Sequence, residues 1–319
     1  RSNGALQGTI KIELKVHKFD IAESKITHSI YYRAVLDDAR ESVGSEFRNA
    51  EQMQEELQDL RDHGVRNPTM YQPISKTESL RQVLELRQAL GMTTGSLYYL
   101  GIQTTPTFLG NNAPQAERQL RALFSQINGI AQSYGFTSVY IYGKDEAQGK
   151  ELVAQRKLWE ILHSLGGKAF VAGYTASFEL VGDLLDLLVH AHQPSVEEAR
   201  KWQSSGHKIF NYANPQTGPE NPFPYRLNYG IALWANDYDG AMPYAYQHCF
   251  GSCWNDVDHP TYRDHNFTYP TVEGVIDTLA WEGFREAVDD IRYLTTLETL
   301  LSNGSTNTTP AADQARSFL

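Results

Sequence analysis

The feature that most constrains the fold is a regular exchange between short apolar segments and amphipathic segments, which begins at Ser29. Segments rich in β-branched and aromatic residues predict strands at residues 30–36, 65–71, 97–102, 139–142, 168–171, 185–189, 208–212 and 240–244. Segments with helical periodicity predict helices at residues 46–63, 77–90, 114–134, 148–165, 177–182, 195–204, 225–236 and 279–301. Eight strands, each followed by a helix, predict an α/β protein with the (β/α)8 TIM-barrel fold.

Two further properties favour this barrel over an open, doubly wound sheet. The chain has 319 residues, and a (β/α)8 barrel commonly takes roughly 250 residues as one domain. An open sheet that binds a nucleotide needs a glycine-rich turn after its first strand, and no G-x-G-x-x-G occurs there. We therefore expect a barrel that works without a cofactor.

The two ends of the chain differ from the repeating part. Residues 9–21 alternate apolar and polar side chains, which predicts a half-buried strand. Because a lone strand cannot hold itself, we interpret residues 1–25 as a strand and linker that end an accessory β-sandwich domain lying upstream. The barrel is expected to span residues 26–301, and the small polar residues from Ser302 onward predict a flexible tail over 302–319.

The charge pattern disfavours two classes of partner. The 38 acidic residues exceed the 28 basic ones, which gives a net charge of −10, and the basic residues are scattered along the chain. This distribution argues against a nucleic-acid backbone as a ligand. No apolar run approaches the roughly 20 residues of a membrane-spanning helix, so we expect neither nucleic acid nor membrane as a partner.

The two cysteines are too few for a disulfide framework, and the histidine spacings fit no zinc signature. Cys249 and Cys253 are compatible with a local bridge and equally with two reduced thiols. His190 and His192 have the spacing of two ligands on one side of a strand, but the sequence matches no zinc signature. We expect no metal, and we expect His190 to bind substrate instead.

Two adjacent carboxylates, Asp145 and Glu146, follow the strand predicted at residues 139–142. Neighbouring side chains on a regular strand point to opposite faces, so the pair shares one site only where the strand gives way to a loop. Gly143 supplies the backbone freedom for that change of direction. An acidic pair before a helix is often only a helix start, but the carboxyl ends of barrel strands are where active sites lie. The pair is therefore our candidate catalytic site.

The ends of the other predicted strands carry tyrosine, histidine and asparagine rather than charged residues. Such side chains offer flat apolar faces to sugar rings and hydrogen-bonding edges to hydroxyl groups. Trp281, at the start of the last predicted helix, adds a large aromatic face. The predicted substrate-binding residues are Tyr71, Tyr142, Tyr174, His190, Asn211, Tyr212, Tyr244, Tyr246 and Trp281.

Ordinary glycoside hydrolysis needs two carboxylates on opposite sides of the scissile bond, about 5–5.5 Å apart in retaining enzymes. Many barrel glycosidases place the second carboxylate after strand seven, but Asn211, Tyr212 and Asn214 stand there. Substrate assistance avoids a protein nucleophile, because the 2-acetamido oxygen of an N-acetylhexosamine attacks its own anomeric carbon. One acid and one adjacent carboxylate that stabilises the acetamido group satisfy this chemistry.

Three segments resemble the catalytic domain of glycoside hydrolase family 123. They are Y-G-K-D-E at 142–146, Y-P-T-V-E-G-V-I-D-T at 269–278 and W-E-G-F-R-E-A-V-D-D-I-R-Y-L at 281–294. The resemblance implies a barrel that is often preceded by a β-sandwich and that acts as a β-N-acetylgalactosaminidase by substrate assistance. It implies Glu146 as the general acid/base and Asp145 as the residue that orients the acetamido group. Many members follow the pair with proline, whereas Ala147 stands here, and this departure bears on the sugar specificity.

Three alternatives remain at this point. A glycosidase on a sugar without an acetamido group, including an endo-acting one, requires a second carboxylate. The candidates for it are Glu179, Asp237, Asp256, Asp258 and Glu273. A non-catalytic carbohydrate-binding barrel requires none, and a metal-dependent hydrolase is the most distant class. The substrate class favours an extracellular or periplasmic location.

Overall fold

The computed structural model describes residues 11–16, 18–37, 39, 46–110, 112–212, 221–303 and 309–319. The chain divides into two compact units. One unit comprises residues 24–291, and the other combines residues 1–23 with residues 292–319.

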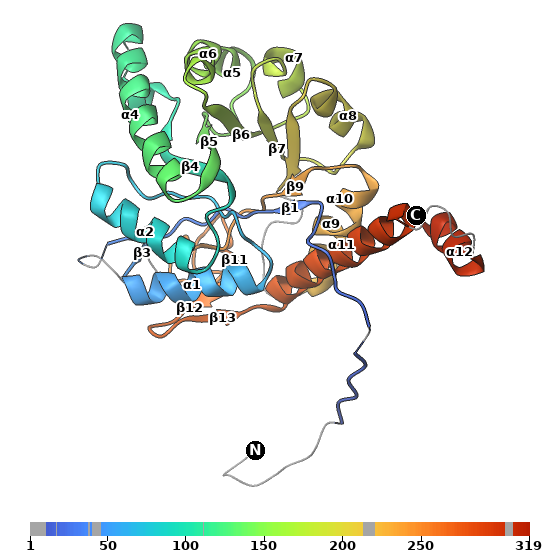
Figure 1. Cartoon of the computed structure of the whole chain (residues 1–319). Coiled ribbons are helices and arrows are strands. Elements are labelled where there is room, and N and C mark those ends of the chain that lie inside the picture. Colours follow the sequence, from blue (N-terminus) through green and yellow to red (C-terminus); the bar gives the residue numbers. More distant parts are fainter. Residues whose placement is uncertain are drawn as a thin grey trace, which may run out of the picture. The chain divides into compact units, whose positions relative to one another are not determined.

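The larger unit is built on a seven-stranded sheet in which every neighbouring pair of strands is parallel. Its order is β1-β9-β8-β7-β6-β5-β4. The strands are β1 (Thr27–His28), β4 (Gly95–Gln103), β5 (Phe136–Tyr142), β6 (Lys168–Gly173), β7 (Leu187–His190), β8 (Lys208–Asn211) and β9 (Gly240–Ala241). Figure 1 shows the sheet curling, with α4 to α8 outside it. The predicted α/β barrel is confirmed.

The segment around Met70 bridges β4 and β1. Its amide donates to the carbonyl of Tyr98 at 2.9 Å, and its carbonyl accepts from Leu100 at 2.8 Å. On the other side, the amide of Thr69 donates to the carbonyl of Ile30 at 3.0 Å. The strand predicted at 65–71 is therefore reduced to one bridge, and these bonds close the ring of strands.

The first predicted strand, at residues 30–36, is displaced. The chain pairs with β9 through β1 and continues alongside it to Tyr31, whose amide donates to the carbonyl of Pro243 at 3.1 Å. Beyond that point the chain leaves the sheet, and β2 (Val35–Leu36) pairs with β3 (Phe47–Arg48) instead. The carboxyl end of the first barrel strand is thus near Tyr31 rather than Leu36.

Helices follow the strands in the predicted order. They are α1 (Ala50–Asp62), α2 (Thr77–Ala89), α3 (Pro106–Leu109), α4 (Ala113–Ser133), α5 (Gly149–Val153), α6 (Arg156–Ser164), α7 (Ser177–Val181), α8 (Val196–Ser204), α9 (Pro222–Tyr229), α10 (Ile231–Ala235) and α11 (Leu279–Asn303). Helix α1 starts later than predicted because Asn49 and Gln52 form a capping box ahead of it. The helix predicted at 225–236 breaks at Gly230, where a Cβ would lie 2.7 Å from the carbonyl of Arg226.

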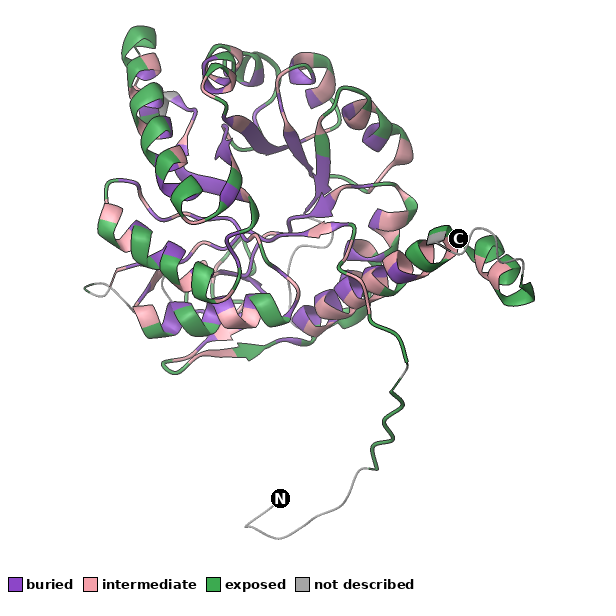
Figure 2. Ribbon diagram, in the orientation of Figure 1, coloured by how far each residue is buried: buried purple, intermediate pink, exposed green. Residues whose placement is uncertain are grey.

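Aromatic side chains fill the inside of the barrel. The ring of Tyr98 lies 5.2 Å from that of Tyr140, 5.6 Å from Phe170 and 5.9 Å from Phe210. These residues come from β4, β5, β6 and β8, so their contact spans the interior and leaves a packed core rather than a pore. Figure 2 shows the strands buried, with the outer faces of the helices exposed.

The chain after β9 forms two antiparallel pairs of short strands. β10 (Gln247–His248) pairs with β11 (His265–Asn266), and β12 (Thr268–Pro270) forms a hairpin with β13 (Val275–Asp277). Cys249 and Cys253 form a disulfide next to β10, which answers the question that the sequence left open.

The smaller unit departs from the sequence prediction at both ends. No strand is present in the described residues before Thr27, and residues 9, 10 and 17 of the expected strand lie outside the described residues. The tail expected to be flexible forms α12 (Pro310–Phe318), which begins with proline and is capped by the Thr309 hydroxyl. Among the described residues, no helix is both long and apolar enough to cross a bilayer.

Candidate active site

The candidate carboxylates lie directly beyond β5, as predicted. Gly143 follows the strand, and its amide donates to the carbonyl of Phe170 at 2.9 Å. A Cβ at this position would lie 2.7 Å from Gln155 and 3.0 Å from Trp159. Glycine is therefore required because the chain passes close to the following helices as it leaves the sheet.

The backbone at Glu146 adopts a left-handed conformation, with φ of 49°. This region is sparsely populated by residues other than glycine, and such outliers gather at functional sites. The amide of Glu146 donates to the carbonyl of Ala172 at 3.1 Å, which ties the turn to β6. The turn breaks the strand alternation that would send the two neighbouring carboxylates to opposite faces.

Asp145 is held by a pair of tyrosines. The hydroxyl of Tyr142 donates to Asp145 Oδ1 at 2.5 Å, and the hydroxyls of Tyr142 and Tyr31 are 3.1 Å apart. Burial raises the pKa of Asp145 above its usual value, the Tyr142 hydrogen bond lowers it, and the charge of Glu146 raises it again. The net pKa is raised, so the ionised form of Asp145 requires a higher pH than that of an ordinary aspartate.

Glu146 is held by two other tyrosines, one on each oxygen. Tyr174 donates to Oε2 at 2.6 Å, and Tyr212 donates to Oε1. The hydrogen bond to Glu146, followed by burial, raises the pKa of Tyr174 to about 12. Burial and the same carboxylate raise the pKa of Tyr212 as well. Both phenols therefore remain protonated donors. We call Tyr31, Tyr142, Asp145, Glu146, Tyr174 and Tyr212 the tyrosine–carboxylate cluster.

Arg33 brings a positive charge to the edge of the cluster. Its guanidinium donates to the Tyr244 hydroxyl at 2.9 Å and to Glu46 at 2.6 Å, and it lies 5.2 Å from the ring of Tyr71. Tyr244 in turn packs against Tyr31, with ring centroids 5.4 Å apart. The positive charge of Arg33 lowers the pKa of Asp145, against the effect of burial. Tyr71 and Tyr244, both predicted as site residues, thus flank the cluster.

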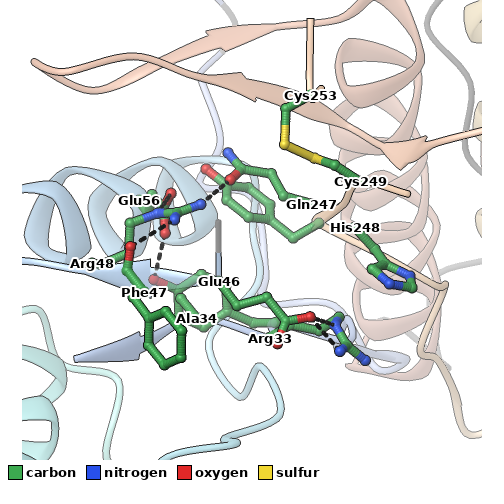
Figure 3. Close-up of a pocket in the computed structure, with 12 residues that line it drawn as sticks. Arg33, Ala34, Glu46, Phe47, Arg48, Glu56, Gln247, His248, Cys249 and Cys253 are labelled. Atoms are coloured by element: carbon green, nitrogen blue, oxygen red, sulfur yellow. Dashed lines mark hydrogen bonds and ion pairs between the residues drawn. A yellow bond between two sulfur atoms is a disulfide. The ribbon is translucent and has the colours of Figure 1, made fainter. Parts of the chain in front are cut away.

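A cavity of about 320 Å³ lies beside Arg33. Figure 3 shows the disulfide on one side of it and Arg48 between Glu56 and Gln247. Arg48 bonds Glu56 and Gln247 at 2.6 Å each, so its charge is internally satisfied. No residue of the tyrosine–carboxylate cluster lines this cavity, so it adjoins the candidate carboxylates through Arg33 rather than enclosing them.

His190 and Asn211 lie behind the cluster rather than in it. His190 is buried, and Thr175 and the Tyr238 hydroxyl engage its two ring nitrogens at 3.0 and 2.9 Å. Burial lowers the pKa of His190 to about 4, so the ring is neutral near pH 7. The Asn211 amide donates to the carbonyls of His190 and His192. These residues support the strand ends, and Asn214 lies outside the described residues.

Tyr246 and Trp281 do not join the cluster. Both are fully buried, and both donate to Asp59 Oδ2, at 2.7 and 3.0 Å. The position of Tyr246 after β9 and that of Trp281 in the first turn of α11 suggested the rim of the barrel. Their hydrogen bonds to Asp59, on α1, place them away from the cluster instead.

Sequence analysis missed Tyr31 and Arg33. Both follow directly on β1 and its extension, at the true carboxyl end of the first barrel strand. Residues 30–36 are mostly apolar, so they were predicted as one continuous strand. The expected carboxyl end of the first barrel strand was therefore Leu36. The arginine at position 33 was the one signal in the sequence that the strand stops earlier.

No family model and no curated protein matches the sequence. Among solved structures, a family 2 β-galacturonidase from Eisenbergiella tayi is similar, with a TM-score of 0.50 and 12% identity. The match covers 84% of this chain and 52% of the enzyme, so the chain spans about half its length. A family 5 mannosidase from Rhizomucor miehei has a TM-score of 0.49 and 11% identity, over 87% of this chain and 95% of the mannosidase. What the chain shares with them is the barrel fold.

Proposed function

We propose that this chain is a glycoside hydrolase that cleaves β-linked N-acetylhexosamine, most specifically N-acetylgalactosamine, by a retaining, substrate-assisted mechanism. The observation that carries the proposal is the pair of adjacent carboxylates beyond β5, with Asp145 bound by Tyr142 and Glu146 bound by Tyr174 and Tyr212. The barrel fold and the resemblance to family 123 support the same class. The names of the similar solved structures, a β-galacturonidase and a mannosidase, agree with a glycosidase in general.

Glu146 acts as the general acid and then as the general base. In the first step its proton passes to the glycosidic oxygen while the acetamido oxygen attacks the anomeric carbon and the leaving group departs. In the second step it takes a proton from the water that attacks the same carbon and opens the oxazolinium ring. When Glu146 is protonated, one oxygen still accepts from the buried Tyr212, and the half-buried Tyr174 gives way to the substrate.

Asp145 orients the acetamido group. Tyr142 fixes one of its oxygens, and the other faces no hydrogen-bond donor among the described residues. That oxygen accepts the acetamido N–H, and the negative charge stabilises the positive charge that develops on the oxazolinium. Burial has the largest effect and raises the pKa of Asp145, and the hydrogen bond from Tyr142 and the positive charge of Arg33 oppose it in favour of the ionised form.

The rival mechanism needs a second carboxylate, and three of its five candidates, Asp256, Asp258 and Glu273, lie on or beside the β10–β13 segment. Asp256 accepts from the Tyr269 hydroxyl at 2.9 Å, and Asp258 accepts from the Ser252 amide at 2.8 Å. Glu273 lies in the turn between β12 and β13 and lines a cavity against α1. In the part of the chain that the structure describes, none of these three hydrogen bonds to the tyrosine–carboxylate cluster.

The test pairs each aryl N-acetyl-β-hexosaminide with its 2-hydroxy counterpart. We expect turnover of acetamido sugars alone, the galacto compound ahead of the gluco compound, and competitive inhibition by a thiazoline analogue of the oxazolinium ion. Turnover of the 2-hydroxy sugars without thiazoline inhibition would refute substrate assistance. Glycan binding without turnover of either set would refute the hydrolase.

Tyr142→Phe is expected to move the acidic limb of kcat/KM to higher pH. The hydroxyl of Tyr142 lowers the pKa of Asp145, so its removal raises that pKa, and the ionised form is lost earlier as the pH falls. The measurement is kcat/KM on an aryl N-acetyl-β-hexosaminide between pH 3 and 8. Tyr140→Phe, on the same strand inside the barrel, is the matched control. An acidic limb that shifts equally in both variants would contradict the assignment.

The disulfide supports the proposed location. Disulfides form and persist in oxidising compartments and are rare in the cytosol. The bridge between Cys249 and Cys253 is consistent with the extracellular or periplasmic space in which enzymes meet large glycans.

A further inference from the structure

Three side chains with metal-ligand chemistry converge away from the tyrosine–carboxylate cluster. Asp59 lies on the last turn of α1 and His63, four residues later, is the C-cap of the same helix, a spacing that brings the two side chains together. Asp277 comes from the end of β13. One ligand atom from each of the three lies within 4.8 Å of the others.

His63 carries a nitrogen that the protein leaves unused. The side chain is buried, with 6% of its surface exposed, and Nδ1 bonds the carbonyl of Asp59 at 2.9 Å. Nδ1 also lies 3.0 Å from the carboxylate oxygen Asp59 Oδ1. A ring nitrogen bound to a carbonyl carries the proton, so in the neutral ring, the form that binds a metal, the lone pair is on Nε2. Nε2 is buried, has no hydrogen-bond partner among the described residues and lies 3.9 Å from Glu282 Oε1.

Outer contacts hold the ligand groups in place. Asp59 Oδ2 accepts from Tyr246 at 2.7 Å and from the indole of Trp281 at 3.0 Å. The His63 ring stacks on Trp281, with centroids 4.5 Å apart and an interplanar angle of 18°. Hydrogen bonds and packing of this kind orient the ligands of metal sites and tune their affinity.

An acidic cavity reaches one of these groups, Asp59, from the outside. It has a volume of about 390 Å³ and lies between α1 and the β12–β13 hairpin, which Figure 1 shows side by side. Its charged lining residues are all acidic: Glu55, Asp59, Asp62 and Glu273. A cavity lined by one sign of charge concentrates the opposite ion.

We propose that Asp59, His63 and Asp277 bind a divalent transition-metal cation of the zinc class, with Glu282 within reach as a fourth ligand. Imidazole together with carboxylate oxygens favours zinc over calcium, which takes oxygen ligands alone. The ligands come from α1, β13 and the first turn of α11, so the ion ties the hairpin and the start of α11 to the barrel. The role is structural, and it is independent of the proposed hydrolysis.

The test is isothermal titration of the chelator-treated full chain with zinc chloride, and in parallel with calcium chloride. We expect one saturable zinc site, weaker or absent calcium binding, and a rise in Tm with zinc. Asp277→Asn, at an exposed position, should weaken zinc binding by at least about tenfold. Asp62→Asn makes the same change in the same cavity without removing a ligand, and it should bind zinc as the wild type does.

Three outcomes would overturn the proposal. The first is the absence of saturable zinc binding to the wild-type chain. The second is calcium binding as tight as zinc binding, which would refute the zinc class. The third is an equal loss in Asp62→Asn and Asp277→Asn, which would show diffuse attraction to the acidic cavity rather than a site.

Discussion

Glu146→Gln is expected to lower kcat on aryl N-acetyl-β-hexosaminides with poor leaving groups by about 10²–10⁴-fold, the usual contribution of a general acid. Glutamine keeps the size and the acceptor oxygen that Tyr212 binds, but it has no proton to give. A dinitrophenyl leaving group departs without protonation, so its cleavage should suffer far less in the first step. The measurement is kcat and kcat/KM across a leaving-group series.

Glu151→Gln is the control for this variant. Glu151 lies on α5, just beyond the active-site turn, and its exposed carboxylate pairs with Lys144 at 2.7 Å. We expect this control to retain wild-type rates. A loss in Glu146→Gln that is equal for all leaving groups would contradict the role of general acid, because it would show that the side chain acts on something other than the departing oxygen.

Asp145→Asn is expected to lower kcat on acetamido substrates by about 10²–10³-fold, the scale on which a single electrostatic contact to a transition state acts. Asparagine is nearly isosteric but lacks the charge that stabilises the oxazolinium. Because that ion is positive, inhibition by a thiazoline should weaken together with kcat. The measurement compares, in Asp145→Asn, the fold-loss in kcat with the fold-loss in affinity for the thiazoline.

The control for this second variant is Asp183→Asn, whose exposed carboxylate pairs with Arg156 and which should leave catalysis intact. The decisive experiment incubates Asp145→Asn with 2-hydroxy glycosides and azide. Accumulation of a glycosyl azide of a 2-hydroxy sugar would show that Asp145 acts as the nucleophile in the wild-type protein. The adjacent pair would then be the right site with the wrong mechanism.

The sequence was sufficient for the barrel and for the position of the candidate carboxylate pair because both depend on local order along the chain. The alternation of strands and helices specifies which ends of the strands meet, and Asp145 and Glu146 follow their strand directly. Thr309 and Pro310, the N-cap and first residue of the last helix, are also a local signal. The small polar residues around them nevertheless led to the prediction of a flexible tail.

What the sequence could not supply was the direction of side chains whose partners are distant. Tyr246 and Trp281 stand near barrel ends in the sequence, and both donate to Asp59, which lies 187 residues before the first and 222 before the second. Tyr31 was missed because an apolar run does not reveal where it leaves the sheet. In each case the position of the side chain depends on a contact between residues far apart in the sequence, which sequence periodicity does not reveal.

The closure of the barrel at Met70 has a consequence for thermal unfolding. Neighbouring strands β4 and β5 share a ladder of paired residues, whereas the described seam beside Met70 is a single bridge with its flanking backbone bonds. Local opening takes the least free energy where such bonds are fewest. Tyr31 stands one residue from the seam bond at Ile30 and supports Tyr142, which holds Asp145. We therefore expect the bridge beside Met70 to open first on heating and to loosen Asp145 while the rest of the sheet stays folded. Activity is expected to be lost at a lower temperature than the fold.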